Sequence, residues 1–170
     1  ERLVEATLKR EAIAIYGDYD VDGVTSASLL TSFFRCLGIE PRVFVPDRFA
    51  DGYGLNAERV RELVQDGAQI LVTVDCGTSN RDEIQIAQNE GCDVIVVDHH
   101  TVPSVPAKPL ALLNPARSDC RFPFTKLAAV GVAFFLCISL RRALRERGFF
   151  TAEQPEPDLR TLLPYVALGT

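Results

Sequence analysis

Three aspartates at alternate positions follow an apolar run near the start of the chain. Asp18, Asp20 and Asp22 stand in the segment IAIYGDYDVDGVTSAS, residues 13–28. In an extended segment, side chains at alternate positions point the same way, so three carboxylates would crowd on one side. Their repulsion, and burial beside an apolar strand, would raise their pKa values unless a cation neutralised them. A divalent metal ion is the simplest such cation. The alternative is that one aspartate caps a helix and the others are solvated loop residues.

The pattern of an apolar run that ends on an acidic residue occurs twice more. Residues 69–75 read QILVTVD, and residues 93–98 read DVIVVD and continue into two histidines. The side chains added to the set are Asp75, Asp98, His99 and His100. Carboxylate oxygens with imidazole nitrogens suit Mn²⁺ or Mg²⁺ better than a structural zinc site, which would favour thiolates. One carboxylate can bridge two ions about 3.5 to 4 Å apart, the arrangement that hydrolyses phosphate esters and anhydrides.

The periodicity of apolar residues predicts the elements that must bring these side chains together. We expect strands at residues 12–16, 42–46, 69–75, 93–98 and 110–113, and helices at 1–10, 24–37, 57–66, 81–89, 127–147 and 158–168. Apolar runs without polar alternation are typical of strands buried on both faces of a parallel sheet. Right-handed βαβ crossovers would place the carboxyl ends of these strands at one edge. We therefore predict an α/β fold: an open, mostly parallel five-stranded sheet with helices on both faces.

The composition limits the classes of protein that fit. The chain has 170 residues, of which 47% are hydrophobic and 24% charged, the balance of one soluble globular domain. With a net charge of -5, the chain does not have the excess of basic residues expected of a protein that coats nucleic acid. The five cysteines form no C-x-x-C pair, which argues against a disulfide framework and favours a reducing cytoplasm. The longest uncharged apolar run, residues 127–140, is too short to cross a membrane.

Six segments in order along the chain closely resemble the RecJ branch of the DHH phosphoesterase family. They are YGDYDVDGVTSASLL, DGYGLN, LVTVDCGTSN, VIVVDHHTVP, LNPAR and PFTKLAAVGVAF. The triplet that names the family stands here as Asp98, His99 and His100, and the resemblance runs over residues 11–170. It implies a DHH domain with two Mn²⁺ or Mg²⁺ ions that hydrolyses single-stranded DNA from 5′ to 3′ in DNA repair and recombination. Single-stranded DNA is then the substrate, and a single-strand-binding protein or a helicase is a candidate partner.

The resemblance also implies roles for individual residues. Asp20 and Asp22 would each bind a different ion, Asp75 would bridge the two, and His99 would be a ligand. His100 would be a ligand or would meet the scissile phosphate, and Asp18 would be a ligand or orient water. Asp98 stands beside two histidines, so we expect it to orient an imidazole rather than to bind metal itself. The predicted catalytic set is thus Asp20, Asp22, Asp75, His99 and His100, with Asp18 as a further metal ligand.

Two departures from the family pattern qualify these expectations. Many members carry a histidine where this chain has Tyr16. Members also carry another metal-binding aspartate after a segment resembling LVALGT, and a second domain that binds nucleic acid. We therefore expect residues 1–170 to be a DHH phosphoesterase domain, truncated before the last metal-binding motif and lacking that second domain, and weakly active or inactive alone. The competing functions are an oligonucleotide or cyclic-dinucleotide phosphodiesterase, an inorganic pyrophosphatase, and a non-catalytic replication or repair scaffold.

The segment DRFADGYGLN, residues 47–56, combines two glycines with charged residues and is expected to be an exposed site loop. Within it, Arg48 and Tyr53 are candidates for contact with a nucleotide, and ordinary packing of the loop is the alternative.

Overall fold

The computed structural model describes residues 1–49 and 52–170, and within this part of the chain five strands form one parallel sheet. The strand order is β2-β1-β3-β4-β5. The strands are β1 (Ile13–Gly17), β2 (Arg42–Phe44), β3 (Ile70–Val74), β4 (Asp93–Val97) and β5 (Ala111–Leu113). The predicted open five-stranded sheet is confirmed, and every pairing is parallel.

The register sets the ends of the three central strands level with one another. Gly17 of β1 pairs with Val74 of β3, and Val74 pairs with Val97 of β4. The chain passes from β1 to β2 on one side, and β3 then lies on the other side of β1. The direction of winding therefore changes between β1 and β3, which is where open α/β sheets leave a crevice for ligands. The acidic residues that follow these strands start from this crevice.

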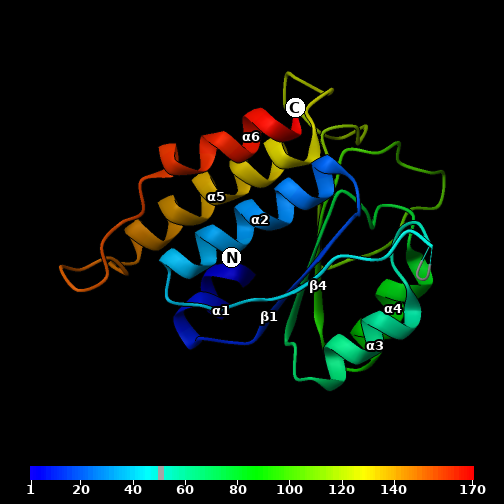
Figure 1. Ribbon diagram of the computed structural model, residues 1–170, viewed down its shortest axis with the longest axis horizontal. Coiled ribbons are helices and arrows are strands. Elements are labelled where there is room, and N and C mark those ends of the chain that lie inside the picture. Colours follow the sequence, from blue (N-terminus) through cyan, green and yellow to red (C-terminus); the bar gives the residue numbers. More distant parts are fainter. Residues whose placement is uncertain (50–51) are drawn as a thin grey trace.

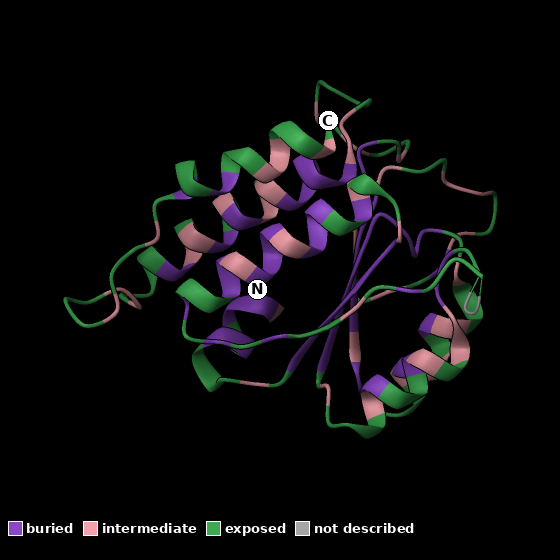
Figure 2. Ribbon diagram, viewed as in Figure 1, coloured by how far each residue is buried: buried purple, intermediate pink, exposed green. Residues whose placement is uncertain are grey.

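Helices cover both faces of the sheet (Figure 1). Those on one face are α1 (Arg2–Lys9), α2 (Val21–Cys36), α5 (Ala129–Glu146) and α6 (Leu163–Gly169), and those on the other are α3 (Ala57–Gln65) and α4 (Arg81–Asn89). Alternate residues of β1 enter the two cores: Ile13 and Ile15 pack under α2 and α5, and Ala14 and Tyr16 face α3 and α4. Purple strands between half-purple helices in Figure 2 show the resulting three layers. Among the described residues no helix combines the length and apolarity needed to span a bilayer.

Two helices differ from the expected ranges by more than two residues at one end. Helix α2 begins at Val21, three residues before the predicted start, because the Asp20 side chain caps its first turn by accepting a hydrogen bond from the Gly23 N–H group. The expected helix at residues 158–168 is a 3-10 turn, η1 (Leu159–Leu162), followed by α6. Pro164 lies in the first turn of α6, where its missing N–H group costs no hydrogen bond.

Candidate metal centre

The turn between β1 and α2 is tight because residue 23 has no side chain. A Cβ atom on Gly23 would lie 2.5 Å from the backbone oxygen of Asp18. Only glycine lets the first turn of α2 lie this close to the end of β1. The turn leaves Asp18 almost fully buried, at 2% exposure, with the Tyr19 N–H group donating to its Oδ1 at 2.8 Å. Burial raises the pKa of Asp18, the hydrogen bond from Tyr19 opposes this, and the charge of Asp20 raises it further.

Asp22 does not share one extended face with Asp18 and Asp20, so that premise of the sequence analysis is wrong. It lies in the first turn of α2, and its carboxylate faces the N-terminus of α5. The Ala129 N–H group donates to Oδ2, and the Val130 N–H group donates to Oδ1, each at 2.8 Å. The residue that precedes α5, Ala128, offers no side-chain cap, so Asp22 supplies the acceptors that the first turn of α5 needs. In the sequence, the signal for this contact is a long predicted helix whose start has no residue that could cap it.

Asp75 occupies the centre of the site with a strained backbone. It follows β3 with φ of 61°, in the left-handed region that few residues other than glycine adopt, and it is 1% exposed. Its Oδ1 lies 3.2 Å from His99 Nε2 and 3.9 Å from His100 Nδ1, but neither contact has hydrogen-bond geometry. Within residues 1–49 and 52–170 this buried oxygen has no hydrogen-bond partner. Burial raises the pKa of Asp75 to about 6; His99 opposes this shift, and the charges of Asp22 and Asp20 add to it.

Asp98 holds the two histidines in place. Its Oδ1 accepts hydrogen bonds from the N–H groups of His99 at 2.7 Å and His100 at 3.2 Å, and lies 2.7 Å from the His100 ring Nδ1. Its Oδ2 accepts from the Thr78 N–H group at 3.0 Å. Burial alone would raise the pKa of Asp98, but the hydrogen bonds from Thr78 and His100 outweigh it and lower the pKa. An ionised carboxylate only accepts, so His100 Nδ1 carries a proton, and in the neutral ring the lone pair is then on Nε2.

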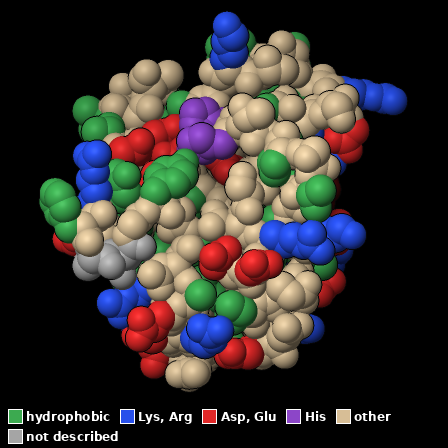
Figure 3. All heavy atoms as spheres, turned by 90° about the vertical axis from the view of Figure 1, so that its right-hand side faces the viewer, with side chains coloured by type: hydrophobic (Ala, Val, Ile, Leu, Met, Phe, Trp, Pro, Cys, Tyr) green, Lys and Arg blue, Asp and Glu red, His purple; other side chains and the backbone are tan. Residues whose placement is uncertain are grey.

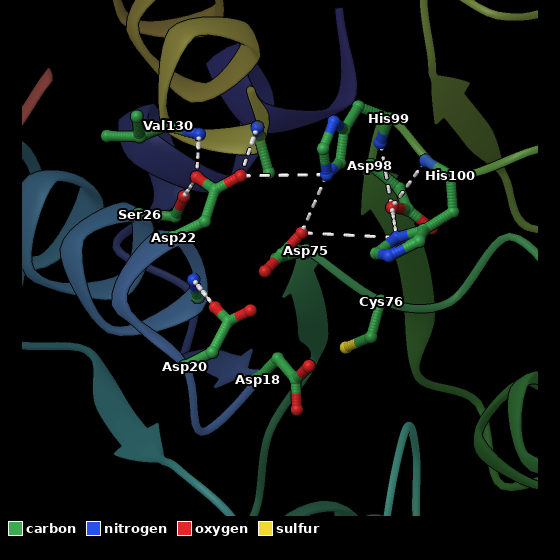
Figure 4. A network of polar contacts seen from close by, with 12 residues as sticks. Asp18, Asp20, Asp22, Ser26, Asp75, Cys76, Asp98, His99, His100 and Val130 are labelled. Carbon is green, nitrogen blue, oxygen red and sulfur yellow. Dashed lines mark hydrogen bonds and ion pairs between the residues drawn. The ribbon is translucent and has the colours of Figure 1, made fainter. Parts of the chain in front are cut away.

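Two groups of potential ligands share Asp75. Asp75, His99 and His100 form one group, and Asp18, Asp20 and Asp75 form the other; within each, one ligand atom per residue lies within 4.8 Å of the others. Figure 4 shows Asp75 between the lower aspartates and the two imidazoles. Asp22 belongs to neither group, although its Oδ2 lies 3.6 Å from His99 Nε2. The alternative from the sequence holds only in part: Asp20 does cap a helix, but Asp18 is not solvated.

This cluster of charged side chains is better explained if it binds a cation than if it does not. Five carboxylates and two imidazoles gather at this edge of the sheet (Figure 4), and among the described residues the buried Oδ1 of Asp75 has no hydrogen-bond donor. Asp75 beside His99 raises the pKa of that imidazole, the response of a base placed among anions. The histidines reach the molecular surface with acidic side chains next to them, so the site is open to solvent (Figure 3). Hard oxygen ligands with two imidazoles suit Mn²⁺ or Mg²⁺.

Two tyrosines that the sequence analysis singled out have different surroundings. Tyr16 points into the core on the α3 side, where its hydroxyl donates to the Gly54 carbonyl at 3.3 Å and accepts from the Asn56 N–H group at 3.1 Å. It therefore holds a loop and does not take the place of a metal-binding histidine. Tyr53 does reach the site, with its hydroxyl 3.1 Å from His100 Nε2. The expected site loop, residues 47–56, includes residues 50 and 51, which lie outside the described residues.

Comparison with known proteins gives concordant matches. The profile of the DHH family, N-terminal domain, matches residues 12–170. The single-stranded-DNA-specific exonucleases RecJ of Haemophilus influenzae and Dickeya dadantii are 43% and 44% identical over 99% and 100% of this chain. The chain spans only 29% and 30% of the length of these two relatives. A crystal structure of exonuclease RecJ bound to manganese superposes with a TM-score of 0.82 at 33% identity, over 99% of this chain and 40% of that one.

Proposed function

The chain belongs to the DHH family, and we propose that it is the metal-binding catalytic part of an exonuclease that degrades single-stranded DNA from the 5′ end. The observation that carries the proposal is the pair of ligand groups that meet at Asp75. A single carboxylate common to two groups is what a site for two ions requires. The names of the similar proteins support DNA as the substrate, and one of them was crystallised with manganese.

The position of each side chain indicates which of the two metal ions it would bind. Asp18 and Asp20 would hold one Mn²⁺ or Mg²⁺ ion, His99 and His100 the other, and Asp75 both. Asp22 lies 3.6 Å from His99 and joins the set from the side of α5. When bound, the two ions would supply an activated water and neutralise charge on the phosphoryl oxygens.

Around that centre, the protein controls the orientation of His100 and the protonation of Asp75. Asp98 fixes the His100 ring through Nδ1, so the lone pair of Nε2 points away from Asp98 and toward Tyr53. His100 can therefore offer this lone pair to a metal ion or, once Nε2 is protonated, donate an N–H group to a phosphate oxygen. Asp75 must be ionised to bind a cation, and its raised pKa makes this state sensitive to mild acid.

The surroundings of the site offer contacts for a nucleotide. Tyr19 and Tyr53 meet edge to face with ring centroids 6.5 Å apart, and the Arg48 guanidinium lies 5.7 Å from the centre of the Tyr19 ring. We include Arg48 and Tyr53 in the proposal as contacts to the strand, since aromatic faces stack with bases and a guanidinium binds phosphate.

The proposal extends to the place of action and to partners. All five cysteines are free thiols, which supports a reducing cytoplasm. An enzyme restricted to single strands depends on a step that opens or protects them, so a helicase or a single-strand-binding protein is the partner class that we propose.

Metal binding by this chain and substrate choice by the intact protein test the proposal separately. We expect calorimetry with MnCl₂ to detect binding that Asp75→Ala abolishes. We expect the intact protein in Mn²⁺ to release the label of 5′-labelled single-stranded DNA on a short product, to shorten 3′-labelled strands progressively, and to leave blunt duplex DNA intact. Absence of Mn²⁺ binding would support a non-catalytic scaffold. Faster turnover of dinucleotides, cyclic dinucleotides or pyrophosphate than of single-stranded DNA would replace the exonuclease with one of those hydrolases.

A further inference from the structure

The segment LNPAR resembles a family motif, and its asparagine lies beside the metal centre. Asn114 follows β5 and is 4% exposed. Its Nδ2 donates to the His100 carbonyl at 2.9 Å and to Thr78 Oγ1 at 3.0 Å, and its Oδ1 accepts from the Ala116 N–H group at 2.8 Å. The orientation of the amide is fixed, because a carbonyl can only accept and a backbone N–H group can only donate.

These bonds close a network around the histidine pair. Thr78 receives a hydrogen bond from Asn114 and donates its own N–H group to Asp98 Oδ2 at 3.0 Å. The other oxygen of Asp98 accepts hydrogen bonds from the backbone N–H groups of His99 and His100. The backbone of His100 is thus held from both sides, by Asp98 at its nitrogen and by Asn114 at its carbonyl oxygen.

We propose that Asn114 is a positioning residue of the metal centre, which fixes the His100 backbone and through it the direction of the His100 imidazole. This inference rests on the proposed function only in taking the centre to bind metal. Asn114 does not contact the ions or the substrate in this role. If it merely closed the turn at residues 114–116, the bond from Ala116 to Oδ1 would suffice and both Nδ2 donors would be dispensable.

Two variants separate positioning from turn closure. Asn114→Asp keeps the size of the side chain and the acceptor for Ala116, but it removes both donors. Asn114→Ala removes all three bonds. The matched control is Asn89→Ala at the exposed end of α4, where the Asn89 Oδ1 accepts from the Gln85 side chain at 3.0 Å. Urea unfolding of each variant measures global stability independently of the metal centre.

The measurements are MnCl₂ affinity by calorimetry and, in metal-free protein, amide hydrogen exchange of Thr78 and His100 by NMR. For both Asn114 variants we expect Mn²⁺ affinity to fall about 10- to 100-fold, the usual effect of losing a residue that orients a ligand. We expect exchange at the His100 and Thr78 N–H groups to accelerate more than exchange in β1 and β3. Asn89→Ala should change neither quantity.

The outcomes distinguish failure of this inference from failure of the proposed function. Unchanged Mn²⁺ affinity and unchanged exchange in Asn114→Asp would overturn the positioning role. If the unsubstituted chain bound no Mn²⁺, the proposed function would fail, and the exchange data would still decide whether Asn114 holds His100. If neither Asn114 variant folds, Thr78→Val removes one acceptor of Nδ2 and keeps the side-chain shape. We expect this variant to bind Mn²⁺ about 3- to 10-fold more weakly, and unchanged binding and exchange would contradict the inference.

Discussion

Replacing Asp75 by asparagine should stabilise the metal-free protein while it destroys the metal centre. Burial raises the pKa of Asp75 from the usual 3.8 to about 6, so the folded state disfavours the ionised carboxylate. At 1.36 kcal/mol for each pKa unit, the full cost would be about 3 kcal/mol. Water that reaches this open site screens part of it, so we expect a gain of about 1 to 3 kcal/mol in the free energy of unfolding at pH 7.5. Asparagine also tolerates the positive φ at this position.

The pH dependence gives the sign of the effect. Between pH 3.8 and about 6 the folded state binds more protons at Asp75 than the unfolded state, so this residue makes stability fall as pH rises through that window. Below pH 3.8 the carboxyl group is neutral in both states, and the advantage of Asp75→Asn should disappear.

Urea unfolding with a metal chelator, at pH 7.5 and at pH 3.5, measures both values. Asp82→Asn, an exposed aspartate of α4, is the control and should change stability by less than about 1 kcal/mol. In MnCl₂ the unsubstituted chain should gain stability and Asp75→Asn should not. An Asp75→Asn variant that is no more stable than the original at pH 7.5, or equally favoured at both pH values, would refute the reasoning.

Three further outcomes follow from the same geometry. Asp20→Asn should keep the cap of α2, because asparagine caps a helix as well as aspartate does, and the free energy of unfolding in urea should change by less than about 0.5 kcal/mol. Calorimetry on the same variant should find Mn²⁺ binding weakened at least about tenfold. Gly23→Ala should lower the free energy of unfolding in urea by about 2 to 4 kcal/mol, because the added Cβ would meet the backbone of Asp18. The control Ser28→Ala on the same helix should be nearly neutral. A Gly23→Ala variant of unchanged stability would show that the turn can relax. Mn²⁺ affinity measured by calorimetry should fall about tenfold from pH 7 to pH 5, because Asp75 becomes protonated below about 6, and a flat profile would exclude it as a ligand.

The sequence by itself determined the elements and most of the candidate ligands. Apolar runs that end on aspartate at positions 18, 75 and 98 predicted strands with acidic ends, and the structure places all three at one edge of the sheet. This was predictable because the pattern that makes a strand is local, and parallel strands joined by helices must end on the same side. The histidine pair and the family membership could also be predicted from short runs of consecutive residues.

Tertiary structure decided how those residues meet. The strand order and register determine that Asp75 lies between the two ligand groups, and only the folded backbone reveals its left-handed conformation. Asp22 caps a helix that begins 107 residues further along the chain, and Asn114 reaches back to the carbonyl of His100. No periodicity encodes such contacts, because they depend on which surfaces the packing of α5 and β5 against the sheet brings together. The sequence thus named the chemical groups, and the packing determined which of them can share a cation.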